Sequence, residues 1–202
     1  MKKGRTYEND QDKVIYIQNT IAIPKIYSKA WPGSIIESVD GRHQDELCRR
    51  FDFSGIDKIV FLSQGGFLHL GQRFRWAEKG KVCQYDDFTL RYKRPDSSYK
   101  TEWEKIIMAV KKGLPLPNYY AYGHLNAEHT DFERFRVIDF SKFIELYRAK
   151  KLGSGRKSDG APYRAVDSNG KIAYFLAWPM YKLKQHGCIF WELTSVTNSI
   201  KL

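Results

Sequence analysis

The residues best suited to chemistry lie together in one stretch of the chain, from Phe53 to Arg94. Asp57 stands at the start of the apolar run IDKIVFL, and the two strands predicted after it, FLHLGQRFRW and DDFTLRYKR, are rich in arginine. An acid on one strand, beside cations on its hairpin partner, can bind a phosphate group and assist its cleavage. The stretch therefore predicts a site for phosphate chemistry.

The cations of this stretch alternate with apolar residues, so they share a face within each strand. If the two arginine-rich strands are neighbours, their cations converge on one surface that can follow a phosphate backbone. Between residues 69 and 112 there are eleven Lys and Arg against six Asp and Glu, which makes the stretch basic. The predicted phosphate-binding cations are Arg73, Arg75, Arg91, Lys93 and Arg94.

An ordinary solvated sheet face is the alternative for these cations. In that case the arginines pair with the nearby acids Glu78, Asp86 and Asp87. Both interpretations stay open at the level of the sequence.

The overall charge favours a polyanionic partner. The 202 residues contain 34 Lys and Arg against 23 Asp and Glu, a formal charge of +11. Cations that neutralise phosphates release the counterions around nucleic acid, and this release drives binding. Hydrophobic residues make up 42% of the chain, which excludes a disordered protein and suffices for the core of one domain. We therefore expect a globular protein that binds nucleic acid, with DNA favoured over RNA.

The cysteines and the hydropathy pattern indicate a cytoplasmic protein. Cys48, Cys83 and Cys188 are far apart and form no CxxC pair, so neither a zinc knuckle nor a disulfide framework is predicted. The basic N-terminus has no apolar segment behind it, and no run of about 18 apolar residues occurs. We expect neither a signal peptide nor a membrane span. The absence of GxxxxGK[ST] and GxGxxG motifs excludes P-loop and dinucleotide-binding sites.

Periodicity and turn residues predict a single domain with an α/β fold, with α+β as the alternative. Its mixed central sheet is expected to be flanked by helices. Residues 1–12 are predicted to form a flexible N-terminal tail, and residues 13–202 the domain. Thr101 and Glu104 have capping-box spacing, which predicts a helix that begins there and ends at Gly113.

The other elements are predicted from pattern alone. A broken helix is expected at residues 34–52, and a second helix, with Ser141 as its N-cap, ends near Gly153. A basic loop is expected to follow at residues 153–165. Further strands are predicted at residues 14–23, 118–125, 132–140, 171–183 and 188–196.

The order helix, three strands, helix, strand over residues 34–125 resembles the core of the PD-(D/E)xK nuclease superfamily, a restriction-endonuclease-like fold. Residues 126–202 would then be a C-terminal extension. In that superfamily a helix supplies an acid, one strand supplies an Asp, and the next strand supplies an acid and a lysine two residues apart. The carboxylates hold Mg²⁺, which polarises the phosphoryl group and activates water.

The resemblance implies a role for particular residues of this chain. Glu46 corresponds to the helix acid, with Glu37 in reserve, and Asp57 to the strand acid, so that Glu46 and Asp57 would bind Mg²⁺. Arg73 corresponds to the lysine and would clamp the scissile phosphate. Gly71 stands where the superfamily has its last acid, which favours a metal site that has lapsed.

Three functions are therefore expected from the sequence. The first is nucleic-acid binding with Mg²⁺-dependent phosphodiester hydrolysis. The second is the same fold acting as a binding module without catalysis. The third is a protein of a phage or mobile element that binds another protein through its aromatic C-terminal strands. A homodimer is compatible with each of them.

Overall fold

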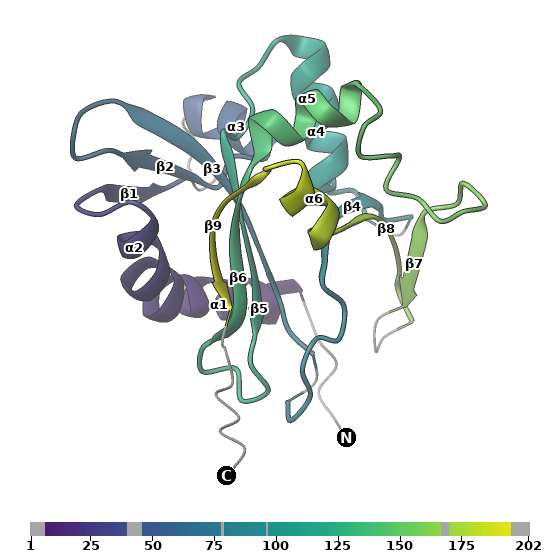
Figure 1. Ribbon diagram of the computed structural model, residues 1–202, viewed down its shortest axis with the longest axis horizontal. Helices are drawn as coiled ribbons and strands as arrows, with labels where there is room; N and C mark the ends of the chain where they lie inside the picture. Colours follow the sequence, from purple (N-terminus) through teal and green to yellow (C-terminus); the bar gives the residue numbers. More distant parts are fainter. Residues whose placement is uncertain (1–6, 40–45, 78, 96, 167–169, 195–202) are drawn as a thin grey trace.

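Two β-sheets form the frame of the protein, as expected for a mixed α/β fold (Figure 1). The computed structural model describes residues 7–39, 46–77, 79–95, 97–166 and 170–194. In spatial order, the large sheet consists of β1 (Ile35–Ser38), β2 (Lys58–Phe61), β3 (Phe67–Arg75), β5 (Tyr119–Leu125), β6 (Phe132–Asp139) and β9 (Ile189–Thr194). The small sheet consists of β4 (Asp87–Lys93), β8 (Ile172–Pro179) and β7 (Tyr163–Val166).

The large sheet mixes antiparallel and parallel strands. Neighbouring strands are antiparallel within the set β1, β2 and β3 and within the set β5, β6 and β9. β3 and β5 run parallel, and the chain between them passes through β4 and helix α4 (Glu102–Lys112), because parallel neighbours need a long crossover. The crossover leaves β4 in the small sheet. The predicted cation surface required the two arginine-rich strands, β3 and β4, to be neighbours in one sheet. They lie in different sheets.

Helix α4 begins and ends where the sequence predicts. The hydroxyl of Thr101 accepts a hydrogen bond from the Glu104 N–H at 3.4 Å, and the Glu104 carboxylate accepts one from the Thr101 N–H at 2.8 Å. Gly113 ends the helix with a φ of 63°, a left-handed conformation that favours glycine. The capping box therefore holds the first turn of α4, which carries Glu102, in a defined place.

The N-terminal segment is helical, so the strand predicted at residues 14–23 is wrong. Helix α1 (Tyr7–Ile17) continues into the π-helix η1 (Gln18–Tyr27) and the short α2 (Ser28–Ala30), and α1 also covers residues 7–12 of the predicted tail. Ile17, Ile21 and Ile26 are buried against the large sheet. β-branched residues favour strands, but burial of an apolar helical face outweighs that preference here.

Two further predicted elements differ in the structure. Residues 34–52 do not form one broken helix, because β1 takes up the first part; helix α3 covers Glu46–Phe53, and residues 40–45 lie outside the described residues. Helix α5 (Phe140–Arg148) is capped by Asp139, which accepts a hydrogen bond from the Lys142 N–H at 2.9 Å, and not by Ser141. The predicted order of a helix, three strands, a helix and a strand is met by α3, β2, β3, β4, α4 and β5, although β4 lies in the small sheet.

The predicted strands of the C-terminal half are confirmed in outline. β5 and β6 match their predicted positions, and β9 lies within the last predicted strand. The strand predicted at residues 171–183 is shorter, because helix α6 (Met180–Gln185) begins inside it. β7 forms at the end of the predicted loop.

The apolar core has two parts, one on each face of the large sheet. The first lies between the two sheets and under α4 and α5, and it centres on Phe88, Tyr120 and Trp178. The ring of Phe88 lies 5.4 Å from that of Tyr120 and 6.1 Å from that of Trp178. The second lies under the N-terminal helices. Because the first part joins the two sheets, it fixes how the cations of β3 and β4 meet.

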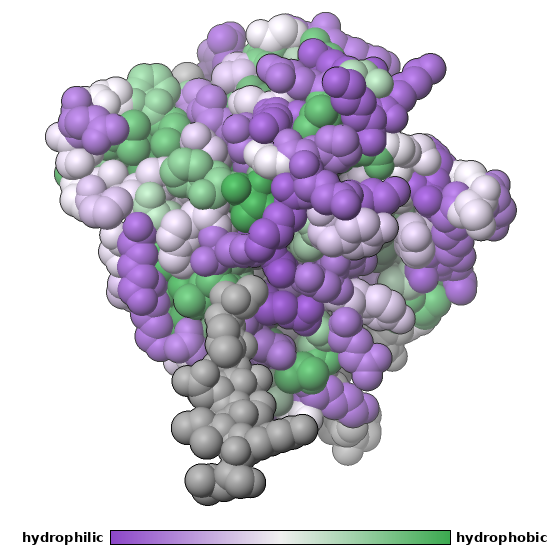
Figure 2. Space-filling view, viewed as in Figure 1, coloured by the Kyte–Doolittle hydropathy of each residue, from purple (hydrophilic) through white to green (hydrophobic). Residues whose placement is uncertain are grey.

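The surface in the view of Figure 1 is mostly hydrophilic, with apolar residues gathered at the upper left, over β1 to β3 (Figure 2). Ile35, Phe61 and Phe67 are exposed on these strands. Among the described residues, no helix is long and apolar enough to cross a membrane.

Candidate phosphate-binding site

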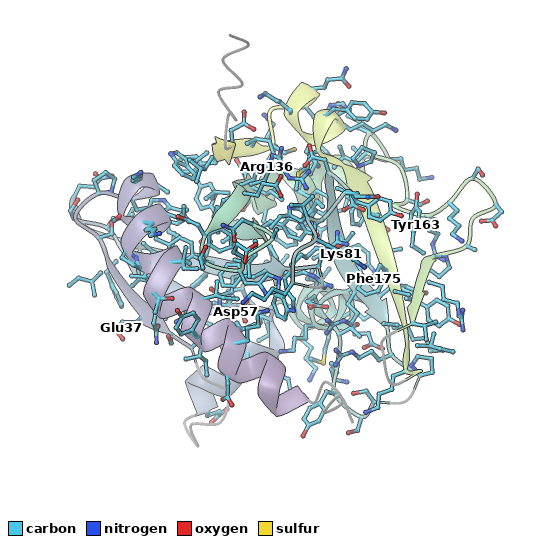
Figure 3. The ribbon with its side chains drawn as sticks, turned by 90° about the horizontal axis from the view of Figure 1, so that it is seen from below. Glu37, Asp57, Lys81, Arg136, Tyr163 and Phe175 are labelled. Carbon is cyan, nitrogen blue, oxygen red and sulfur yellow. The ribbon has the colours of Figure 1, made fainter. Side chains whose placement is uncertain are left out.

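Asp57 is held at the start of β2 by the backbone around it. Its N–H donates to the carbonyl of Leu70 at 2.9 Å, and its carboxylate accepts a hydrogen bond from the Gln72 N–H at 2.7 Å. Figure 3 places Asp57 toward the middle of the molecule, whereas Glu37 lies at its edge. Burial raises the pKa of Asp57 from 3.8 to about 6, against the lowering effect of the Gln72 N–H, Lys105 and Lys58. Asp57 is thus a carboxyl that titrates near neutral pH.

The second acid near Asp57 is one that the sequence analysis missed. Asp52 of α3 is close enough to raise the pKa of Asp57 further, and its own carboxylate accepts a hydrogen bond from Lys105 of α4 at 2.7 Å. The sequence predicted Glu46 of the same helix instead. Glu46 is 78% exposed and pairs with Arg50, one turn along, at 2.6 Å.

The Mg²⁺ site implied by the resemblance is not supported by these placements. Glu46 is engaged by Arg50, and Asp57 by a backbone N–H. Over the part of the chain that the structure describes, no group of three or more His, Cys, Asp or Glu side chains could hold a metal ion. Glu46 and Asp57 are each held by a partner within the protein, and a shared Mg²⁺ ion stays a prediction.

Gly71 lacks a side chain because there is no room for one. A Cβ atom at this position would lie 2.7 Å from two ring carbons of Tyr120 and 3.0 Å from the carbonyl oxygen of Gly55. β3 carries no bulge at this point, so Gln72 keeps the opposite face, where its side chain bonds to Gln18 at 3.0 Å. The position corresponding to the last acid of the nuclease motif is therefore closed by packing.

Arg73 and Arg91 meet at one acid, although their strands belong to different sheets. Arg73 donates to Glu102, in the first turn of α4, at 3.0 Å, and Arg91 lies 3.7 Å from the same carboxylate oxygen. Burial alone would raise the pKa of Glu102, but Arg73 and Arg91 hold it below its usual value. Burial lowers the pKa of Arg91 to about 10, opposed by Glu102 and assisted by Arg73 and Arg94. Glu102 is thus the shared counter-charge of the two arginines.

Arg75 is paired in a different way. It donates to Asp87, the first residue of β4, at 2.7 Å, and to the hydroxyl of Tyr122 at 3.2 Å. Arg73 and Arg75 do share a face of β3, as predicted, since Leu70 and Phe74 are buried on the other side. The alternative interpretation, pairing with local acids, is correct for Arg75, although the face lies between two sheets and not in solvent.

Two arginines of β6 complete this face and were not predicted. Arg136 is 8% exposed and forms two hydrogen bonds to Asp86, at 2.6 and 3.1 Å, and Arg134 lies 3.4 Å from the same residue. In register, Arg73 and Arg136 flank Tyr122, and Arg75 and Arg134 flank the next residue of that face, two positions along β5. The sequence held a signal for them, because Arg-Phe-Arg at 73–75 recurs at 134–136.

Burial and the arginines of β3 and β6 on this face lower the pKa of His124, which lies between those arginines on β5. His124 is fully buried on β5, between Arg75 and Arg134 in register. Burial, and then Arg75, Arg134 and Arg136, lower its pKa to about 3. The ion pairs with Asp86 and Asp87 tie β4 to the large sheet, so the main effect of this face is to join the two sheets.

A pocket of about 180 Å³ lies beside Asp57, and some of the cationic side chains that line it have no partner among the described residues. It is lined by Gly55, Asp57, Gln72, Arg91, Arg94, Tyr99, Lys100, Glu102, Lys105, Ile106 and Tyr120. Within the described part of the chain, the side chains of Arg94 and Lys100 form no hydrogen bond or ion pair, and Nε of Arg91 is buried without a partner. The pocket therefore offers N–H donors that have not been used.

The pocket takes up some of the predicted cations and leaves others out. Arg91 and Arg94 line it, whereas Arg73 and Arg75 are committed to acids, and Lys93 is exposed on β4 outside it. Lys100 and Lys105 were not predicted, because a loop lysine and a helix lysine carry no local sign of where the fold places them.

The raised pKa of Asp57 predicts a pH-dependent effect on stability. A carboxyl that binds its proton more tightly when folded stabilises the fold fully below its ordinary pKa of 3.8, and this is lost as pH rises through about 6. Asp57→Asn should therefore stabilise the protein by up to about 3 kcal/mol at pH 8 and by only about 1 kcal/mol at pH 4.5. Urea unfolding at both pH values measures this, with Asp12→Asn, exposed on α1, as control. A mutant no more stable than the parent at pH 8 contradicts it.

The chain was compared with family models, curated proteins and solved structures. No family model, no curated protein and no solved structure matches it.

Proposed function

We propose that this protein binds nucleic acid through its phosphates, at the pocket beside Asp57. The observation that carries the proposal is the set of unpaired donors there: the side chains of Arg94 and Lys100, and Nε of Arg91. Cationic N–H groups with no protein partner are suited to phosphate oxygens, which accept charge-assisted hydrogen bonds.

The surroundings of the pocket support the same ligand. The formal charge of +11 attracts a polyanion over a distance. The N-terminal end of α4 lies at the pocket, and its dipole adds partial positive charge there. Tyr99, 68% exposed, offers a ring on which a base can stack. Each of these features is compatible with single-stranded as well as duplex ligands.

Salt-dependent binding tests the proposal. Fluorescence anisotropy with duplex DNA, single-stranded DNA and RNA of one sequence gives the slope of log Kd against log salt. In Arg94→Gln/Lys100→Gln we expect affinity to fall by about tenfold or more, and the duplex slope to fall by about two, since two phosphate contacts are lost. Lys29→Gln/Lys182→Gln removes the same charge from exposed sites on α2 and α6 and serves as the matched control.

The outcomes separate the proposal from a general effect of charge. Equal losses in the two double mutants would mean that net charge, and not the pocket, attracts nucleic acid. Absence of binding at low salt would end the proposal. The relative affinities for the three ligands measure the expected preference for DNA.

The same mixtures also test cleavage. After incubation with Mg²⁺, the strands are separated on a denaturing gel. Intact strands indicate binding alone. Shortened strands indicate hydrolysis, and Asp57→Asn then shows whether Asp57 takes part in it.

A further inference from the structure

The pocket is a recess whose lining runs from buried to exposed residues. Its buried members are Ile106 of α4 and Tyr120 of β5, both 2% exposed, with Asp57 and Gln72 partly buried beside them. Tyr99 and Lys100, in the loop before α4, are exposed. A strand that reaches the buried residues of this recess enters and leaves over its exposed residues. The interior of a long strand would have to leave in two directions, whereas an end needs only one.

The unpaired charge in the recess exceeds what one internal phosphate needs. Lys105 is already paired with Asp52, and Nη1 of Arg91 is paired with Glu102. Arg94, Lys100 and Nε of Arg91 remain for the ligand. An internal phosphodiester carries one negative charge, whereas a terminal phosphate carries about 1.5 to 2 at neutral pH and three acceptor oxygens.

The two acids of the recess set a further requirement. Oε2 of Glu102 is buried without a partner, and the lining also includes Asp57. These oxygens accept hydrogen bonds and repel a ligand that offers negative charge alone. The sugar and base of the terminal nucleotide carry O–H or N–H donors, so a strand end can bring a donor as well as charge.

We propose that the recess binds the terminal phosphate of a nucleic-acid strand, so that the protein holds strand ends in preference to strand interiors. This inference rests on the proposed function and specifies its ligand. Arg94 and Lys100 contact the phosphate oxygens together with Nε of Arg91, and Glu102 accepts a hydrogen bond from the ligand.

The test uses single strands of one sequence that differ only at their ends. Strands of about 12 nucleotides, close to the footprint of single-strand-binding sites, carry a 5′-phosphate, a 3′-phosphate or two hydroxyl ends. We expect one phosphate-ended strand to bind about tenfold more tightly than the hydroxyl-ended one. Arg94→Gln and Lys100→Gln should each reduce this difference. Lys93→Gln, exposed nearby on β4, should weaken all three strands alike and preserve it.

Competition identifies what the recess recognises. Adenosine 5′-monophosphate should displace the phosphate-ended strand, and adenosine should not. If adenosine competes equally well, or if the three strands bind equally while binding stays salt-dependent, the terminal-phosphate inference is wrong and the proposed function stands. If no strand binds at low salt, the proposed function itself fails.

Discussion

Replacing Gly71 with aspartate is expected to destabilise the protein strongly, although it places an acid where the nuclease motif has one. The new Cβ would lie 2.7 Å from ring carbons of Tyr120, and Tyr120 cannot retreat, because Phe88 and Phe140 pack against it with ring centroids 5.4 Å away. Overpacking of this kind costs about 1–3 kcal/mol, and the buried carboxylate adds to it. Urea unfolding followed by near-ultraviolet circular dichroism measures the loss.

Two further variants separate the causes of that loss. Gly71→Ala introduces the Cβ without the charge and should lose stability to a lesser degree. In a Tyr120→Ala background, which removes the clashing ring, the additional cost of Gly71→Ala should become small. A Gly71→Asp protein as stable as the parent would show that the packing around Tyr120 is looser than the structure indicates.

Glu102→Gln is expected to lower the free energy of unfolding by about 3 kcal/mol, because it leaves two arginines between the sheets without their counter-charge. Arg73 is 12% exposed and Arg91 25%, so water cannot replace the carboxylate fully. The glutamine keeps the shape and one acceptor, so the loss reports charge and not a cavity. Urea denaturation at pH 7 measures it.

The control and the coupling make this prediction specific. Glu46→Gln removes the exposed pair with Arg50 and should change stability by less than about 0.5 kcal/mol. If Glu102 acts through Arg91, the double mutant Glu102→Gln/Arg91→Gln should be more stable than the sum of the single effects predicts. Strict additivity, or a loss for Glu102→Gln no larger than for Glu46→Gln, would contradict the shared role of Glu102.

Several elements were predictable because their causes are local. The capping box of Thr101 and Glu104 and the glycine at 113 define α4 within a dozen residues of chain. Alternation along β3 puts Arg73 and Arg75 on one face, and it does so whichever strands lie beside β3. The mixed α/β class follows from the same local patterns.

The N-terminal segment shows where local signals mislead. Residues 14–23 are rich in isoleucine and have the composition of a strand, yet they form the end of α1 and part of η1. The deciding term is the burial of Ile17, Ile21 and Ile26 against the large sheet. That apolar surface exists only once strands from β2 to β6 have assembled.

The basic character of this protein, the parity of its arginines and the caps of its central helix are predictable from the sequence, since each depends on composition or on residues a few positions apart. Which cations pair with acids and which do not depends on the fold. The crossover through β4 and α4 brings Glu102 to Arg73 and Arg91, and Asp87 to Arg75, and it leaves Arg94 and Lys100 unpaired at the pocket. The physical reason is that an ion pair depends on distances of a few ångströms in space, which the spacing of residues along the chain does not contain.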